Sequence, residues 1–190
     1  VSDIHVGDDG IIEVTLPIRA TGNITITVNN KQYIVSIKEG KSIGNIFGLK
    51  EGNYTVFAKY DGDDNYGGSN AFAKFSVSKV DPTMDVTVDD IIFGEDAIVI
   101  VTLPKDVYGS VYISVGSIYY GVFPNDGKVI QNIEGLDAGT QDIVVHFNGD
   151  SKYNKKDFTK TITVFKANPN PQIFIEDVNY GNIFVINAVL

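Results

Sequence analysis

The chain has 190 residues, no cysteine, no tryptophan and a formal net charge of −9 at pH 7. This acidity argues against binding to nucleic acid or to anionic membrane surfaces, because both need basic protein surface. The absence of cysteine excludes disulfides, thiolate metal sites and cysteine nucleophiles, and no apolar run approaches the length of about 18 residues that predicts a membrane span.

Strand patterns run through the whole chain, and no segment shows a convincing amphipathic helix. In the first half, Ile24, Ile26 and Val28 alternate with polar residues, and the same period of two recurs from Tyr54 to Tyr60. Clusters of Gly, Asn and Asp separate the runs at intervals of roughly 8 to 12 residues, which is typical of a β-sandwich. In the second half, the predicted strands are residues 83–88, 97–103, 110–115, 118–123, 128–133, 140–147 and 158–166.

These runs belong to an internal repeat of 87 residues that contains no insertion. Residues 1–80 and 88–167 share 28 identities in 80 aligned positions. Leu16, Leu103 and Leu190 each lie one period apart. The chain is therefore a tandem array.

Seven short strands in one period is the number found in immunoglobulin-like sandwiches, and the short turns between them favour antiparallel pairing. The sequence thus predicts an all-β fold of tandem immunoglobulin-like antiparallel β-sandwiches. We expect residues 1–80 to form a first repeat without its first strand, residues 81–167 a second repeat, and residues 168–190 the first two strands of a third. Prolines at positions 82, 169 and 171 indicate short, semi-rigid junctions.

Both ends of the chain fall in the middle of the repeat pattern. One interpretation is that the chain is a window of a longer protein whose limits ignore the domain edges. A second is that the tail of one molecule completes the first domain of the next by strand addition, since an incomplete sandwich exposes an unpaired edge.

The clearest local motif is an aromatic residue, one further residue, Gly-Asp, two residues and Tyr. Its shared residues are Gly62, Asp63 and Tyr66 in the first repeat and Gly149, Asp150 and Tyr153 in the second. This motif and the residues that precede it in the first repeat resemble tandem bacterial Ig-like (Big-type) repeat domains. The preceding residues that carry the resemblance are Gly40-Lys41, Ile46, Gly48-Leu49 and Gly52–Val56. Such domains recur in adhesin-like cell-surface proteins of bacteria and methanogenic archaea, and the resemblance covers both full repeats and, more weakly, the tail.

Two roles for the motif stay open at this point. As a structural turn, Gly supplies a positive φ, Asp accepts hydrogen bonds from amides of its own turn, and Tyr packs over the sandwich end with its hydroxyl on a nearby backbone group. As a Ca²⁺ site, Asp61, Asp63 and Asn65 alternate as in a hard-cation loop. Against calcium, the second repeat has Lys152 at the third position, and the bidentate Glu of an EF-hand-type loop is absent.

Catalysis has little support in the sequence. The two histidines, His5 and His146, occupy non-equivalent positions of the repeat, and no Ser, His and Asp set is indicated by spacing. We therefore expect no enzymatic activity and no cofactor other than the calcium just considered.

Two Asn-x-Thr sequons, at Asn23 and Asn53, are candidate glycosylation sites of a surface protein. Neither is matched in the second repeat.

The pattern and the resemblance together favour a structural role. We expect a stalk or filament segment of a large extracellular, adhesin-like surface protein, whose partners are neighbouring Ig-like repeats of the same chain or of other copies. The alternative is an Ig-like binding module that recognises a glycan or protein ligand on a host or neighbouring cell.

Overall fold

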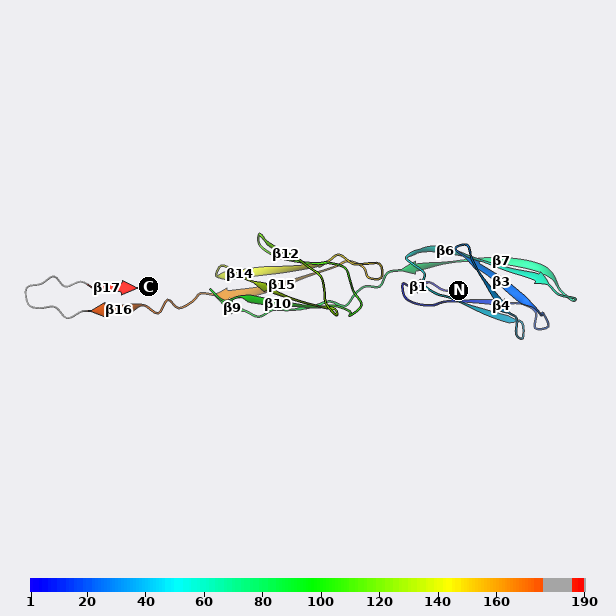
Figure 1. The fold of residues 1–190 in the computed structure, drawn as a ribbon, viewed down its shortest axis with the longest axis horizontal. Coiled ribbons are helices and arrows are strands. Elements are labelled where there is room, and N and C mark those ends of the chain that lie inside the picture. The colour runs from blue at the N-terminus through cyan, green and yellow to red at the C-terminus, as the bar shows by residue number, and fades with distance from the viewer. Residues whose placement is uncertain (176–185, 190) are drawn as a thin grey trace, which may run out of the picture.

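The computed structural model describes residues 1–175 and 186–189 as an all-β chain (Figure 1). Its strands form two β-sandwiches that follow one another along the long axis of the molecule, and a two-stranded hairpin lies beyond the second. The prediction of an all-β fold built from tandem antiparallel sandwiches is confirmed.

The first sandwich combines a five-stranded and a two-stranded sheet. The larger has the order β1 (Ile4–His5), β7 (Gly67–Ser78), β6 (Gly52–Gly62), β3 (Asn23–Val28) and β4 (Lys31–Ser36), and the smaller pairs β2 (Gly10–Thr15) with β5 (Lys41–Ile46). Alternation of apolar and polar residues places Ile24, Ile26 and Val56 in the core, together with Ile12 and Ile46 from the smaller sheet.

The second sandwich has the same plan with one strand more. Its five-stranded sheet has the order β12 (Ile118–Val122), β11 (Val111–Val115), β14 (Gly139–Phe147), β15 (Lys156–Phe165) and β9 (Ile91–Ile92), and its three-stranded sheet has the order β13 (Lys128–Ile133), β10 (Ala97–Thr102) and β8 (Asp85–Thr87). Each of the seven strands predicted for this half is present, with ends within two residues of the prediction. Val99, Val101, Ile143, Val145 and Phe147 are fully buried between the sheets.

The sequence did not predict β1 and β9, and both pair in parallel rather than antiparallel. Ile4 lies opposite Val77, and Ile91 lies opposite Val164. Strands of two residues are too short to show a period, so only the repeat offset of 87 links them. His5 is the second residue of β1.

The main difference between the two sandwiches is β8, which covers the edge of β10. It buries Val86, and Val88 just beyond it is buried as well. Among the described residues, the edge of β2 that corresponds to this edge of β10 carries no strand. As a result Val14 stays half-buried, whereas the corresponding Val101 is fully buried.

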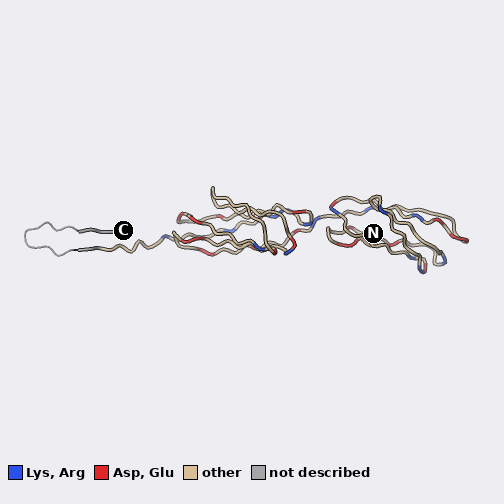
Figure 2. Tube along the Cα trace, in the orientation of Figure 1, with Lys and Arg blue, Asp and Glu red and all other residues tan. Residues whose placement is uncertain are grey.

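The hairpin beyond the second sandwich pairs β16 (Gln172–Ile175) with β17 (Ile186–Val189) in antiparallel orientation. These strands fall in the predicted third repeat, of which residues 176–185 and 190 lie outside the described residues. Within the described part of the chain, no helix is long and apolar enough to span a bilayer. Figure 2 shows acidic and basic residues interspersed along both sandwiches rather than divided into two faces.

Candidate functional site

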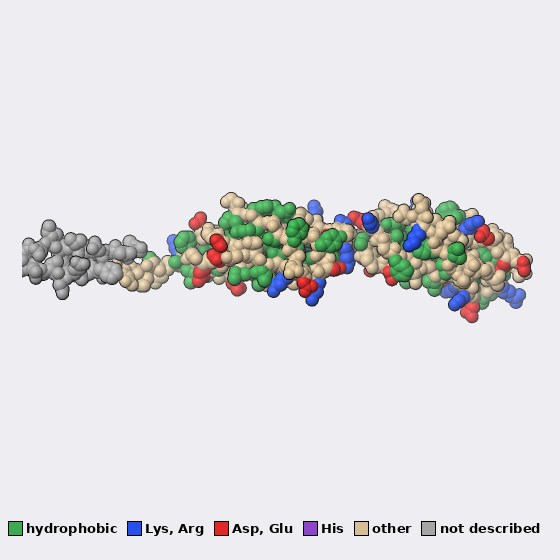
Figure 3. Space-filling model, viewed as in Figure 1, with side chains coloured by type: hydrophobic (Ala, Val, Ile, Leu, Met, Phe, Trp, Pro, Cys, Tyr) green, Lys and Arg blue, Asp and Glu red, His purple; other side chains and the backbone are tan. Residues whose placement is uncertain are grey.

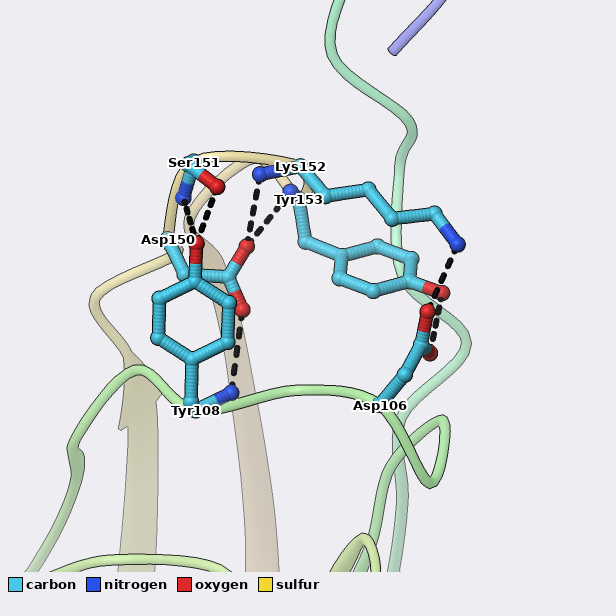
Figure 4. A network of polar contacts seen from close by, with 6 residues as sticks. All are labelled: Asp106, Tyr108, Asp150, Ser151, Lys152 and Tyr153. Atoms are coloured by element: carbon cyan, nitrogen blue, oxygen red, sulfur yellow. Dashed lines mark hydrogen bonds and ion pairs between the residues drawn. The ribbon is translucent and has the colours of Figure 1, made fainter. Parts of the chain in front are cut away.

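The turn motif of the second repeat closes the hairpin between β14 and β15. Oδ1 of Asp150 accepts hydrogen bonds from the backbone N–H groups of Lys152 and Tyr153, both at 2.8 Å. Oδ2 of Asp150 accepts another from the N–H of Tyr108 at 3.1 Å, and the N–H of Asp150 donates to the carbonyl of Tyr153 at 3.0 Å (Figure 4). One carboxylate thus fixes its own turn and ties it to the loop before β11.

The first repeat builds the same turn with the same geometry. Oδ1 of Asp63 accepts hydrogen bonds from the N–H groups of Asn65 and Tyr66, both at 2.8 Å. Oδ2 accepts from the N–H of Thr21 at 2.8 Å and from its hydroxyl at 2.9 Å. Thr21 and Tyr108 lie one period apart. The sequence did not predict that this position binds the carboxylate of the turn. The bond uses a backbone N–H group, which is present whatever side chain the position carries.

The glycines and tyrosines of the motif have distinct roles. Gly62 and Gly149 adopt positive φ values of 96° and 74°, as expected. Tyr153 is buried and donates its hydroxyl hydrogen bond to Oδ1 of Asp106 at 2.8 Å, not to a backbone group as the sequence suggested. Tyr66 is half-buried and packs against the core of the first sandwich.

Asp106 also pairs with Lys152, the residue before Tyr153 in the motif. Its Oδ2 accepts a hydrogen bond from Nζ of Lys152 at 2.6 Å (Figure 4). Lys152 and then the Tyr153 hydroxyl lower the pKa of Asp106, and Asp106 in turn raises the pKa of Lys152. A carboxylate with a lowered pKa and an ammonium with a raised pKa stay paired from acidic to strongly basic pH. The three side chains Asp106, Lys152 and Tyr153 therefore form one polar cluster at this end of the second sandwich.

The linker between the two sandwiches binds to this same turn. The N–H of Val80 donates to the carbonyl of Lys152, and the N–H of Asn154 donates to the carbonyl of Val80, both at 2.9 Å. Two side chains add to these bonds, since Nδ2 of Asn154 lies 2.7 Å from Oδ1 of Asp81 and Nζ of Lys156 lies 2.8 Å from the carbonyl of Pro82. We call residues 80–82 and 150–156 the junction site.

The first sandwich also comes close to the junction site. A Cβ atom at Gly7, in the turn between β1 and β2, would lie 3.6 Å from Cε of Lys152. The end of the Lys152 side chain thus lies near the first sandwich, while its ammonium group pairs with Asp106 of the second. The side-chain hydrogen bonds of the junction site are exposed at Asn154 and half-buried at Lys156.

Both aspartates considered for calcium have other partners in the structure. Asp61 forms an ion pair with Lys59 at 2.6 Å, while Asp63 uses both oxygens for the turn. Asn65 contributes its backbone N–H to Asp63. Among the described residues, no group of three or more His, Asp or Glu side chains is arranged to hold a metal ion.

The two histidines lie in different sandwiches. Nδ1 of His146 on β14 contacts the carboxylate of Asp157, its register partner on the neighbouring strand β15. His5 lies beside Asp8, whose Oδ2 accepts a hydrogen bond from the His5 N–H at 3.0 Å. The structure therefore does not bring the histidines together.

Both sequon asparagines are exposed. Asn23 is the first residue of β3, and its Oδ1 accepts a hydrogen bond from the Ser36 hydroxyl at 3.0 Å. Asn53 is the second residue of β6. Glycosylation at either position stays a prediction, and an intact mass of protein from its natural source tests it.

One aromatic surface lies outside the junction site. Tyr112 of β11 and Tyr119 of β12 stack with ring centroids 5.3 Å apart, and Tyr119 is 63% exposed. Phe123, just after β12, is 75% exposed. Figure 3 shows apolar side chains spread over the second sandwich on the face in view.

The first turn predicts a specific response to acid. The amides of Thr21 and Asn65 hold the pKa of Asp63 far below its ordinary value. An unfolded Asp titrates near pH 4, so Asp63 stabilises the first sandwich fully above about pH 5 and progressively less as the pH falls towards its folded pKa. We expect the difference in melting temperature between the wild type and Asp63→Asn to shrink as the pH falls below about 5.

The measurement is thermal unfolding by circular dichroism across this pH range, with Asp64→Asn at the exposed neighbouring position as the control. A difference in melting temperature between the wild type and Asp63→Asn that does not depend on pH would contradict the lowered pKa of Asp63.

Comparisons with known proteins give structural similarity only. No family model matches the chain, and no curated protein matches it. Among solved structures, the fibronectin(III)-like modules of Clostridium thermocellum CbhA align over 87% of this chain and 90% of their own, with 14% identity and a TM-score of 0.37. A chimeric titin Z1Z2 aligns over 88% and 92% with 13% identity and a TM-score of 0.34. The FN1-FN3 domains of chicken CNTN1 align over 86% and 68% with 13% identity and a TM-score of 0.35. Because these TM-scores are all below 0.5, the assignment of the fold rests on the strand order and register of this chain.

Proposed function

We propose that this chain is a segment of an extracellular stalk, built from Ig-like repeats of an adhesin-like cell-surface protein, and that its role is mechanical rather than catalytic. The observation that carries the proposal is the junction site. Its linker is bound by two backbone hydrogen bonds and two side-chain hydrogen bonds instead of running free between the sandwiches. A spacer that projects a distal binder needs such a junction, because a free linker would let successive domains swing.

The repeat itself supports the proposal. Both copies keep the glycine, carboxylate and tyrosine of the turn, while most of their exposed positions differ. The absence of insertions between the copies gives each repeat the same length, and a spacer of constant rise needs this. The resemblance to Big-type repeats of archaeal and bacterial surface proteins agrees with this role and with a location at the cell surface.

The test is the distribution of distances between the two sandwiches in solution. Because the chain has no cysteine, spin labels can be placed at Gln32→Cys on β4 and Thr140→Cys on β14, both exposed positions. We expect double electron–electron resonance to give one narrow distance distribution. A broad distribution for the otherwise unchanged chain would overturn the proposal.

A matched pair of variants isolates the junction site. Val80→Pro removes the N–H that donates to Lys152, whereas Val80→Ala keeps both backbone bonds. We expect the proline variant to broaden the distance distribution and the alanine variant to leave it narrow. Equal distance distributions in the two variants would show that the backbone hydrogen bonds of Val80 do not fix the position of one sandwich relative to the other.

The binding-module alternative rests on the aromatic surface of Tyr112, Tyr119 and Phe123. Exposed aromatic rings often mark contact surfaces. A screen against glycans and cell-surface proteins tests it: a specific ligand that is lost on Tyr119→Ala favours the module, and inert behaviour favours the stalk.

A further inference from the structure

A short strand near the beginning of each sandwich lies parallel to the last strand of that sandwich. In the second sandwich, β9 pairs with β15 through Ile91 opposite Val164 and Ile92 opposite Phe165. The N–H of Phe93, just after β9, adds a hydrogen bond to the carbonyl of Phe165 at 2.7 Å. In the first sandwich, β1 and β7 pair in the same parallel way. The beginning and the end of each domain are thus held directly to one another.

A carboxylate adds one hydrogen bond to this parallel ladder in both sandwiches. Oδ1 of Asp90, the residue before β9, accepts a hydrogen bond from the N–H of Thr163 at 2.7 Å. Thr163 directly precedes Val164, so this bond lies beside the first residue pair of the ladder. In the first sandwich, Oδ1 of Asp3 accepts a hydrogen bond from the N–H of Ser76 at 2.6 Å. Both carboxylates and both donors lie one period apart, so the bond belongs to the repeat.

A second carboxylate beside each short strand binds in a different way. Oε2 of Glu95 accepts a hydrogen bond from the N–H of Ile92 at 2.9 Å, and the N–H of Glu95 donates to the carbonyl of Ile92 at 2.9 Å. Asp8 and His5 form the same two bonds in the first sandwich, both at 3.0 Å. These bonds join residues three apart in one turn. They shape the turn after the short strand and do not connect it to the last strand.

The parallel direction decides how this pairing responds to tension along the chain. Figure 1 shows that the linker enters the second sandwich at the end next to the first sandwich, and that β15 ends at the opposite end. Because β9 is parallel to β15, tension pulls β9 back towards the linker and β15 on towards its own end. The two strands are therefore sheared along their length. In shear, the hydrogen bonds between two strands are loaded together, whereas in peeling they break one after another.

The beginning of the second sandwich is held by few hydrogen-bonded pairs, so one further bond matters. β15 pairs with β14 through nine residue pairs, whereas β9 pairs with β15 through two and β8 pairs with β10 through three. The bond from Thr163 to Asp90 is therefore a large part of what joins the beginning of the domain to β15. A hydrogen bond to a carboxylate is also stronger than one to a neutral carbonyl.

We propose that the carboxylates of Asp3 and Asp90 bear tension, each as the first hydrogen bond of the parallel ladder that resists extension of its sandwich. The proposal rests on the mechanical role proposed above, and it names the bond within each repeat that supports this role. Repeats in one chain carry the same tension, so the weakest repeat opens first. The same carboxylate at the same place in both copies gives the two sandwiches a matched resistance.

Unfolding of the second sandwich under constant force in optical tweezers tests the proposal. The chain has no cysteine, so DNA handles can be attached to the full chain at Lys79→Cys and Ala167→Cys, on either side of this sandwich. We expect Asp90→Ala to raise the unfolding rate under force by about tenfold, because it removes one charge-assisted hydrogen bond from the sheared ladder. An unchanged unfolding rate in Asp90→Ala would overturn the proposal.

Glu95→Ala is the matched control. It also removes an exposed carboxylate that accepts a backbone N–H beside β9, but the bond that it removes does not reach β15. We expect Glu95→Ala to change the unfolding rate under force by less than about threefold. Equal acceleration in Asp90→Ala and Glu95→Ala would mean that the bond across the two strands has no special role under tension, and it would overturn the proposal.

Unfolding in urea separates a load-bearing bond from one that stabilises the sandwich in general. Without tension, we expect Asp90→Ala and Glu95→Ala each to change the unfolding rate by less than about threefold, since both side chains are exposed. A rise of about tenfold for Asp90→Ala in urea as well would overturn the assignment to tension. These outcomes are distinct from the test of the junction, because a chain with a broad distance distribution between its sandwiches can still lose resistance to force in Asp90→Ala.

Discussion

Gly149→Ala is expected to lower the stability of the second sandwich by about 3 kcal/mol or more. Gly149 has a φ of +74°, which costs about 1 to 2 kcal/mol for a residue with a Cβ atom. That Cβ atom would also lie 2.7 Å from the carbonyl oxygen of Tyr153 and 2.8 Å from the nitrogen of Lys155. Both are backbone atoms of the turn itself, so they move only if the turn opens.

Urea unfolding of the full chain, followed by circular dichroism, measures this loss. Gly116→Ala is the matched control, because Gly116 also has a positive φ, of +54°, but a Cβ atom there would meet no atom within 4 Å. We expect the control to show only the cost of the left-handed backbone. Similar losses in the two variants would mean that the turn relaxes without strain and that its close packing does not stabilise the sandwich.

Most of the fold could be predicted from the sequence because its strands are half-buried and alternate. Ile24, Ile26 and Val28 show the period of two, and all three are buried. The repeat offset of 87 residues then located the corresponding strands of the second sandwich. The strands β1 and β9 escaped prediction because two residues show no period. Their parallel partners lie 73 residues further along the chain, beyond the reach of local pattern.

The junction site could be predicted only in part. The glycine and carboxylate of the turn repeat in the sequence, and their conformation follows from general turn chemistry. The partners do not repeat as residue types: Thr21 and Tyr108 both donate a backbone N–H to the carboxylate. Val80 likewise binds through its main chain. Backbone contacts leave side chains free to vary, and so they leave no compositional signal.

The ambiguity between calcium and turn in Asp61, Asp63 and Asn65 has a physical origin. An alternating set of oxygen-bearing side chains is compatible with a cation loop and with a hydrogen-bonded turn. The two differ only in whether the carboxylate oxygens face a cation or backbone N–H groups. In this structure the oxygens of Asp63 face N–H groups and one hydroxyl.

Asp150→Ala is expected to destabilise the second sandwich by about 2 to 4 kcal/mol, since it removes three hydrogen bonds from backbone N–H groups to one charged acceptor. The matched control is Asp142→Ala, whose exposed carboxylate accepts one bond, from the Thr161 hydroxyl at 2.6 Å, and whose loss should stay within about 0.5 kcal/mol. Urea unfolding compares the two variants, and equal losses would contradict the role of the turn.

Asp150→Ala should also disturb the junction, because the turn that it fixes presents the carbonyl of Lys152 to Val80. The spin-label distance distribution between the sandwiches should therefore broaden in Asp150→Ala as it does in Val80→Pro. Combining the two substitutions should broaden it little further, since both break the same connection. Additive broadening would mean that the turn and the linker act independently, and that the shared motif serves the stability of each sandwich without setting the angle between them.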